Sequence, residues 1–117
     1  MTDLSRPHRQ AKPFIPMTQK IRAIFSKTGN MAFVSHLDLM RLFQRAARRA
    51  KAPVAVTKGF SPHLKISITK ALKLGVESEA EEAVFFMDER VGPQKFAEAL
   101  NEKLPDGVRI KRAEEIS

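Results

Sequence analysis

The chain has 117 residues, a formal net charge of +8 at pH 7 and no cysteine. This length fits one domain, and the lack of cysteine excludes disulfides, thiolate catalysis and thiolate-held zinc or iron–sulfur centres in this chain. No apolar run approaches the roughly 20 residues that a membrane-spanning helix needs, so we expect a cytoplasmic protein without membrane association.

The basic charge is concentrated in one part of the sequence. Residues 20–75 contain twelve Lys or Arg and one acid, Asp38, which sums to +11. Residues 76–117 contain six bases and eleven acids, a sum of −5, and residues 1–19 add +2, which recovers the total of +8. A surface this basic attracts polyanions, because each neutralised phosphate releases a condensed counterion. Function is therefore expected within residues 20–75.

Residues 1–18 predict a flexible basic tail, since they contain three prolines and no apolar segment typical of a signal peptide. Residues 19–117 are expected to form a single domain. Within it, residues 20–26 alternate in the manner of a half-buried strand. Residues 27–30 predict a turn, because Gly and Asn tolerate a positive φ, and residues 31–34 predict a short extension of the sheet.

An amphipathic helix follows this first strand. Ser35 has the features of an N-cap, with Asp38 three residues later in a variant of the capping box. The helix is expected to continue to about Lys51 and to end before Pro53. At 100° per residue, one arc of the helix is apolar and contains Leu39, Met40, Phe43, Ala46, Ala47 and Ala50. The opposite arc contains Arg41, Arg45, Arg48 and Arg49.

The next stretch predicts more β structure. Residues 54–60 and 63–69 are interpreted as one long or bulged strand, interrupted near Gly59 and Pro62, or as two separate strands. Residues 80–87 predict another strand, because apolar residues alternate along them.

A second helix and a last strand complete the predicted domain. The helix begins at Gly92–Pro93, with proline in its first turn, and ends at Pro105. Residues 108–116 predict the final strand. The resulting β-α-β-β-α-β order, with right-handed crossovers, is typical of the ferredoxin-like α+β sandwich, in which four antiparallel strands carry two helices on one face.

Four strings carry a family resemblance: Phe25-Ser26-Lys27-Thr28-Gly29, Ser35-His36-Leu37-Asp38-Leu39-Met40-Arg41, Gly59-Phe60-Ser61-Pro62-His63 and Leu74-Gly75-Val76-Glu77-Ser78. With these strings in this order, residues 20–116 resemble the radical-SAM-linked domain family, a bacterial family of unknown function. In that family the domain often follows a radical-SAM and cobalamin-type enzyme in one polypeptide. Elsewhere it stands alone, near genes that concern ribosomes and RNA turnover.

The resemblance implies a companion of an RNA- or protein-modifying machine and supplies no demonstrated activity. Where the family usually has a proline-rich link, this chain has the more basic residues 69–73. A radical-SAM cluster needs three cysteine thiolates, and this chain has none. The chain therefore cannot be the radical enzyme itself; at most it binds such an enzyme or that enzyme's substrate, and we expect no cofactor on it.

His36 and His63 are the candidate catalytic residues. A helical His36 would project near the middle of the apolar arc, where it acts as a neutral general base or is simply packed and hydrogen-bonded to a neighbouring strand. His63 follows the irregular corner from Gly59 to Pro62, which packing or turn formation explains equally well. The two histidines and Asp38 could form a facial metal triad, but their spacing does not require one, so we expect no metal.

The arginines of the first helix are the main candidates for nucleic-acid binding. They have no acidic partner at i±4, and arginine binds phosphate through two parallel hydrogen bonds. Four lysines would extend this patch if the second strand lies beside it, namely Lys58, Lys65, Lys70 and Lys73. The aromatic signature of the common RNA-recognition module is missing, so phosphate contacts are expected rather than base stacking on the sheet.

These observations predict a non-catalytic domain that binds RNA or a ribonucleoprotein through its first helix and the following basic loops. It would present that substrate to a separate radical-SAM-type enzyme. An alternative is a metal-independent endoribonuclease that uses His36 or His63, by analogy with the ferredoxin-like CRISPR repeat-processing endoribonucleases. A further alternative is a protein-interaction module, in which the acidic residues 77–82 of one copy meet the basic helix of another.

Overall fold

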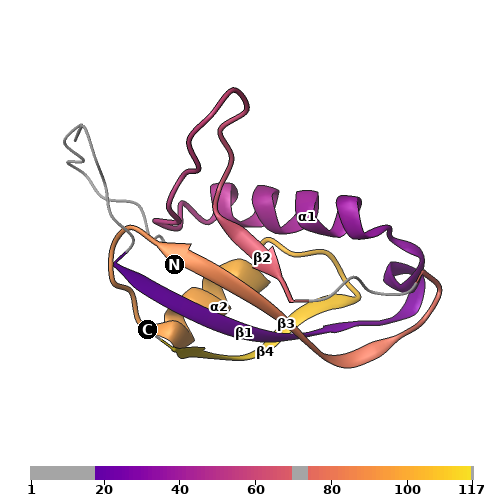
Figure 1. Ribbon diagram of the computed structural model, residues 1–117. Helices are drawn as coiled ribbons and strands as arrows, with labels where there is room; N and C mark the ends of the chain where they lie inside the picture. Colours follow the sequence, from indigo (N-terminus) through magenta and orange to yellow (C-terminus); the bar gives the residue numbers. More distant parts are fainter. Residues whose placement is uncertain (1–17, 70–73, 117) are drawn as a thin grey trace.

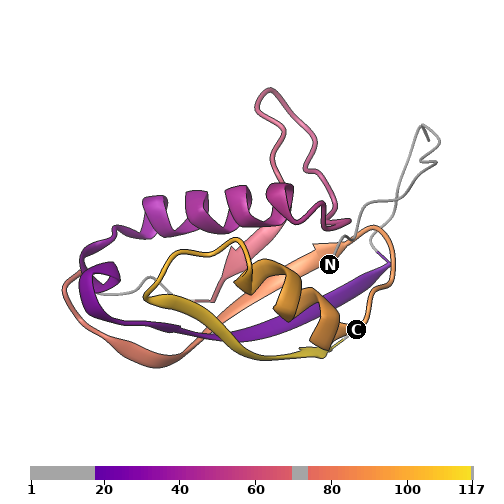
Figure 2. The ribbon, with the colours of Figure 1, turned by 180° about the vertical axis from the view of Figure 1, so that it is seen from behind.

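The computed structural model describes residues 18–69 and 74–116, so the predicted tail lies outside the described residues apart from Thr18. Four antiparallel strands form one sheet in the order β2-β3-β1-β4, and both α-helices cover the same face of it (Figures 1 and 2). In chain order the elements are β1 (Gln19–Lys27), the 3-10 helix η1 (Gly29–Phe33), α1 (His36–Arg49), β2 (Ile66–Ile68), β3 (Ser78–Met87), α2 (Pro93–Asn101) and β4 (Val108–Glu115). The predicted ferredoxin-like α+β fold is confirmed.

The central strand β1 alternates between buried and half-buried residues along its whole length, and its neighbour β3 does so from Ala83 to Met87. Along β1, Ile21, Ala23 and Phe25 are fully buried against the helices, and the residues between them face the other side of the sheet. Ala23 lies opposite Ala83 of β3 and Ala113 of β4. This register fixes which charged residues of the three strands become neighbours on the outer face.

Four phenylalanines form the centre of the core. The ring of Phe43 on α1 contacts Phe25 of β1 and Phe85 of β3 edge-on, with centroid distances of 5.0 and 5.8 Å. Phe85 in turn contacts Phe96 of α2 at 4.8 Å. This chain of rings joins both helices to the two central strands, and each such pair contributes about 0.5–1.5 kcal/mol beyond its buried area.

Helix α1 begins as the sequence predicts. The Oγ of Ser35 accepts a hydrogen bond from the Asp38 amide at 3.1 Å, which satisfies a donor that the first turn leaves free. The helix ends at Arg49, and Lys51 follows with a φ of 56°, in the left-handed region that terminates many helices. The predicted apolar arc faces the core, since Leu39, Phe43 and the alanines of this arc are buried.

The prediction of sheet at residues 31–34 is wrong, because residues 29–33 form η1. The amide of Met31 donates to the Thr28 carbonyl at 3.2 Å, so the backbone bonds locally instead of pairing with a strand. The turn also requires Gly107, which has a φ of 95°. A Cβ on Gly107 would lie 2.7 Å from both the Thr28 oxygen and Met31 Cγ.

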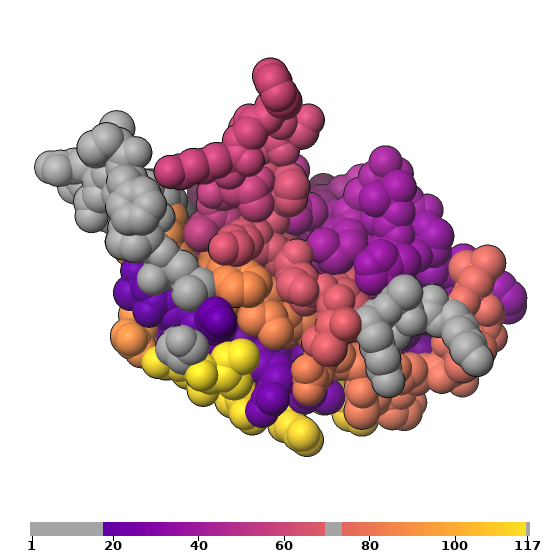
Figure 3. Space-filling model, viewed as in Figure 1, coloured from indigo at the N-terminus to yellow at the C-terminus, as the bar shows by residue number. Residues whose placement is uncertain are grey.

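The strand predicted over residues 54–60 is also wrong, and the predicted strand over residues 63–69 is reduced to β2. Residues 54–64 form a hairpin that projects beside α1 and stands out from the body of the molecule (Figures 1 and 3). Its arms are joined by the bridge between Val56 and Leu64. Gly59 at the tip has a φ of 125°, and a regular strand does not continue through such a residue. We call residues 54–64 the projecting hairpin.

Candidate nucleic-acid interface

The four arginines of α1 form one exposed face of this helix. Because the inner side of α1 is held against the core, these side chains point to solvent, and all four are exposed. Arg41, Arg45 and Arg48 follow the i, i+4, i+7 spacing of a single helical stripe, and the rise of the helix spreads them over roughly 10 Å. We call Arg41, Arg45, Arg48 and Arg49 the arginine face.

Acidic side chains neutralise little of the arginine face. Arg41 Nη1 lies 3.2 Å from Asp38 Oδ1, an i,i+3 pair with both side chains exposed. An exposed pair of this kind contributes only about 0.2–1 kcal/mol. Within residues 18–69 and 74–116, Arg45, Arg48 and Arg49 form no ion pair. Their positive charge therefore remains available to an external anion.

An open groove of about 600 Å³ runs along α1, between the arginine face and the projecting hairpin. Its lining residues are Leu37, Met40, Arg41, Gln44, Arg45, Arg48, Arg49 and His63. The groove combines apolar surface, including Leu37 with 59% exposure, with guanidinium groups. The structure thus brings the four predicted arginines together with His63, a residue 14 positions beyond the end of the helix.

Gln44 holds the projecting hairpin against α1. Its Nε2 donates to the Leu64 carbonyl at 2.7 Å, and its Oε1 accepts from the Leu64 amide at 3.0 Å. This two-bond contact fixes one wall of the groove relative to the other. The sequence reasoning missed Gln44, although a polar residue between buried Phe43 and exposed Arg45 occupies the border of the apolar arc, where a side chain can reach a neighbouring segment.

His63 lies in the exposed stem of the projecting hairpin. Its amide donates to Thr57 Oγ1 at 3.2 Å, and its Nδ1 lies 3.0 Å from the Ser61 carbonyl oxygen. A carbonyl only accepts, so this contact favours the tautomer that carries the proton on Nδ1. The neutral ring then presents Nε2 as a hydrogen-bond acceptor, which is the form a general base needs.

His36 is not brought into the groove. It lies in the first turn of α1 and is exposed, so the interpretation as a packed histidine hydrogen-bonded to a strand is wrong. The reason is its position at the very start of the helix, one turn before the buried part of the apolar arc. Among the described residues, no cluster of three or more His, Asp or Glu side chains could hold a metal ion, and His36, His63 and Asp38 form no such group.

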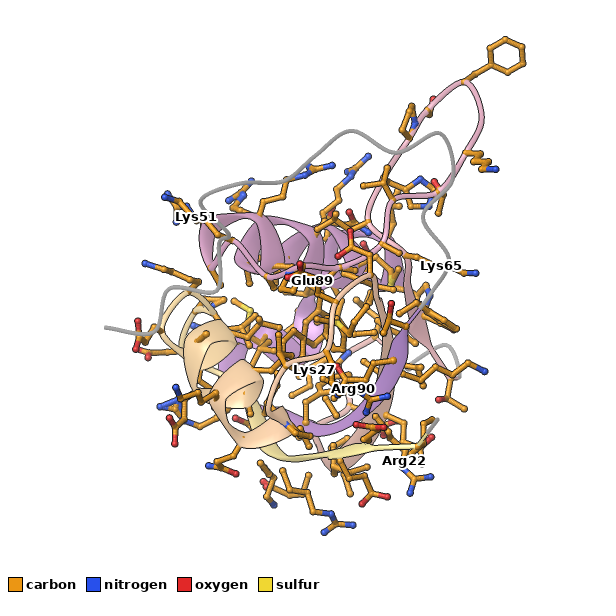
Figure 4. The ribbon with its side chains drawn as sticks, turned by 90° about the vertical axis from the view of Figure 1, so that its left-hand side faces the viewer. Arg22, Lys27, Lys51, Lys65, Glu89 and Arg90 are labelled. Carbon is orange, nitrogen blue, oxygen red and sulfur yellow. The ribbon has the colours of Figure 1, made fainter. Side chains whose placement is uncertain are left out.

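The predicted lysines are divided between several places. Lys58 belongs to the projecting hairpin, whereas Lys65 Nζ lies 4.7 Å from the ring centroid of Phe86. Phe86 alternates with buried residues of β3, so this contact places Lys65 on the outer side of the sheet, away from α1 (Figure 4). Lys70 and Lys73 lie outside the described residues.

The outer face of the sheet is also charged, and several of its charges form ion pairs with one another. Arg22 of β1 contacts Glu114 of β4 at 2.5 Å and Glu82 of β3 at 3.9 Å. Lys111 contacts Glu79 at 3.2 Å. In Figure 4, Arg22 projects from this face, on the side of the sheet opposite the helices. Part of this face therefore presents paired charge, whereas Lys20, Lys65 and Arg112 form no ion pair with the described residues.

Carboxylates of residues 77–82 have partners in the same chain as well. Glu77 Oε2 accepts a hydrogen bond from the Gly29 amide at 2.6 Å. Glu81 accepts from the Ser78 hydroxyl, and Thr69 donates to Glu82 at 3.1 Å. The first and fourth family strings thus meet at η1, where the Gly75 amide also donates to the Ala32 carbonyl at 2.6 Å. These two strings have a structural role at that turn.

The fold and this site define a ferredoxin-like α+β domain with a basic helix beside a projecting hairpin. The chain belongs to a bacterial family described as "Uncharacterized protein conserved in bacteria (DUF2344)", whose model matches residues 20–117. Comparisons with the curated proteins and with the solved structures found no match. Neither helix in the described ranges is long and apolar enough to cross a membrane.

Proposed function

We propose that the protein is a non-catalytic, cytoplasmic domain that binds RNA or a ribonucleoprotein through the arginine face and the groove beside it. The single observation that carries this proposal is the exposed row of arginines, three of which form no ion pair within the described ranges. Unpaired guanidinium groups at helical spacing bind a phosphate backbone without any need to break internal contacts.

The distribution of charge supports the same surface. Residues 20–75, whose net charge is +11, include α1, whereas the acids of residues 76–117 lie among β3, α2 and β4. On the outer face of the sheet these acids meet bases of neighbouring strands, as Glu114 and Glu82 do with Arg22. The row of unpaired arginines makes the α1 side of the molecule positive, and an RNA would be steered there.

The proposed role includes an enzyme partner of the radical-SAM type. The chain has no cysteine and so cannot hold the iron–sulfur cluster of such an enzyme. The domain would bind the RNA or ribonucleoprotein and present it to that enzyme. The resemblance of the four strings to the radical-SAM-linked domain family motivates this part of the proposal.

A ribonuclease is the second candidate function, and His63 is the observation that favours it. His63 lines the groove, and its contact with Ser61 leaves Nε2 as an acceptor. A general base at this place would act on RNA held by Arg45 and Arg48. His36 lies outside the groove and has no part in this version.

The interaction-module hypothesis is less well supported, because the acidic segment is already engaged. Glu77, Glu81 and Glu82 each bond to a group of the same chain. These bonds use part of the acceptor capacity of each carboxylate and leave less of it for the arginine face of a second copy.

The proposal is tested by RNA binding at several salt concentrations. A labelled RNA that contains a stem and a loop is titrated with the wild-type protein and with a variant in which the four arginines are Gln. Each lost phosphate contact should reduce the slope of log K against log[salt] by about 0.7–0.9. The variant should therefore bind more weakly with a flatter slope, and an unchanged slope would remove α1 from the binding site.

The same samples separate binding from cleavage. Labelled RNA is incubated with the wild-type protein and EDTA, and the products are resolved on a denaturing gel. Intact RNA is expected. Cleavage that disappears in His63→Ala, with binding retained, would replace the proposal with the ribonuclease.

A further inference from the structure

The tip of the projecting hairpin carries an aromatic ring that the fold leaves wholly in solvent. Phe60 is 109% exposed, more than any other large apolar residue of the described chain. Burial of a phenylalanine is strongly favourable, so full exposure leaves that contribution unused in the free protein. Gly59 and Ser61 beside it are exposed as well, and nothing lies within 4 Å of the Cβ position of Gly59.

The stem beneath this ring is held in place by hydrogen bonds. The Thr57 amide donates a hydrogen bond to the His63 carbonyl at 2.8 Å, and the His63 amide donates one to Thr57 Oγ1. Below these, Gln44 holds Leu64 against α1 through two further bonds. The ring is therefore carried on a stem that is fixed to the helix and its arginines.

The ring lies within reach of whatever occupies the groove. His63 lines the groove, and Phe60 stands three positions before it in the chain, which limits the distance between their Cα atoms to about 10 Å. The stripe of Arg41, Arg45 and Arg48 extends over a similar length along α1. One polymer a few nucleotides long can thus contact the guanidinium groups and the ring together.

We infer that the RNA bound here is single-stranded at this point, with one unpaired base stacked on Phe60 and its phosphates along the arginine face. The inference rests on the proposed function, because it needs the arginines to hold the RNA backbone. Paired bases in a duplex are stacked on each other and present no free face, whereas unpaired bases stack readily on aromatic side chains. The apolar surface of Leu37 in the groove suits a base or sugar better than a phosphate.

The first experiment compares strands and side chains. A fluorescein-labelled 12-nucleotide RNA, alone and annealed to its complement, is titrated with the wild-type protein, Phe60→Ala and Phe60→Trp. The single strand should bind more tightly than the duplex. Phe60→Ala should weaken single-strand binding by about 5- to 150-fold, and Phe60→Trp should retain it. Because Phe60 is uncharged, the salt slope of Phe60→Ala should equal that of the wild type.

Val56→Ala provides the matched control, since Val56 lies in the same hairpin with 55% exposure and has no ring. It should bind the single strand like the wild type. Equal binding by Phe60→Ala and the wild type, or a preference for the duplex, would overturn the inference and leave the proposed function standing. Salt-independent or absent binding by the wild type to both RNAs would overturn the proposed function as well.

Discussion

Two charged surfaces lie on opposite sides of this small sheet, and they differ in how their charges are satisfied. On the outer face, Arg22 contacts glutamates of both neighbouring strands, and Lys20 and Lys65 lie over the ring of Phe86. On the helix side, three of the four arginines of α1 form no ion pair among the described residues. A basic sequence therefore does not make every face basic. On the helix side three arginines of one helix stay unpaired among the described residues, whereas the outer face combines ion pairs with lysines that lie over an aromatic ring.

Both surfaces depend on the aromatic core, and its removal should have the largest effect. Phe43→Ala deletes the ring that connects α1 to Phe25 and Phe85, so the free energy of unfolding should fall by about 3–5 kcal/mol. Urea denaturation followed by circular dichroism measures the change. A loss below about 1 kcal/mol would mean that α1 is not seated on the sheet as described.

A substitution of Gln44 should loosen the projecting hairpin from α1, and so disrupt the groove, while the aromatic core stays intact. Gln44→Leu leaves the amide and carbonyl of Leu64 without their side-chain partner, which should cost about 1–3 kcal/mol of unfolding free energy. Hydrogen exchange should show lower protection of the Leu64 amide, while the protection of amides in the edge strand β4 should not change. Unchanged protection at Leu64 would mean that the projecting hairpin is held by something other than Gln44.

Single-charge variants sharpen the contrast between the two faces. Arg22→Gln removes contacts to Glu82 and Glu114 and should lower the unfolding free energy by about 0.2–1 kcal/mol. Arg45→Gln has no ion pair to lose within the described ranges and should change stability by less than about 0.5 kcal/mol in either direction. Denaturation curves of both variants and the wild type, recorded under the same conditions, measure the two changes in unfolding free energy. A larger loss from Arg45→Gln than from Arg22→Gln would contradict the account of paired and unpaired charge.

The smallest expected effect concerns the end of β4. Hydrogen bonds from Arg90 and Gln19 lower the pKa of Glu115 below its ordinary value of 4.5. A lowered pKa in the folded state means that this contribution to stability is present above about pH 4.5 and is lost as pH falls through the folded-state value. The wild type should therefore lose slightly more stability than Glu115→Gln below pH 4.5. Identical acid denaturation profiles would show that Glu115 contributes nothing.

The sequence predicts the elements whose signals are local. The spacing of its apolar and basic residues predicts helix α1. Ser35 predicts where the helix begins, because its side chain accepts a hydrogen bond from the Asp38 amide. The strand order then follows from the sequence of elements. The arginine face was therefore predictable as a set of residues before its surroundings were known.

The groove was not predictable, because its second wall depends on contacts between distant residues. Residues 54–60 have the composition of a strand, but the chain turns at Gly59 and pairs Val56 with Leu64 instead. Gln44 fixes that turn across 20 residues of sequence. Lys65, by contrast, stands between Leu64 and Ile66, so alternation alone places it on the far side of the sheet from α1 and could have separated it from the arginine face.

The most direct measurement compares two variants of equal net charge. In one, Arg45, Arg48 and Arg49 are replaced by Gln. In the other, three exposed bases elsewhere are replaced by Gln, namely Lys95, Lys103 and Arg109. Binding of the labelled 12-nucleotide RNA is followed by anisotropy at four salt concentrations. If the unpaired arginines of α1 hold the RNA, the slope of log K against log[salt] should become less steep by about 2–3 in the first variant. In the second variant the slope should stay within about 0.5 of the wild-type value. Equal losses in both variants would mean that net charge alone attracts the RNA, and this would contradict the central claim.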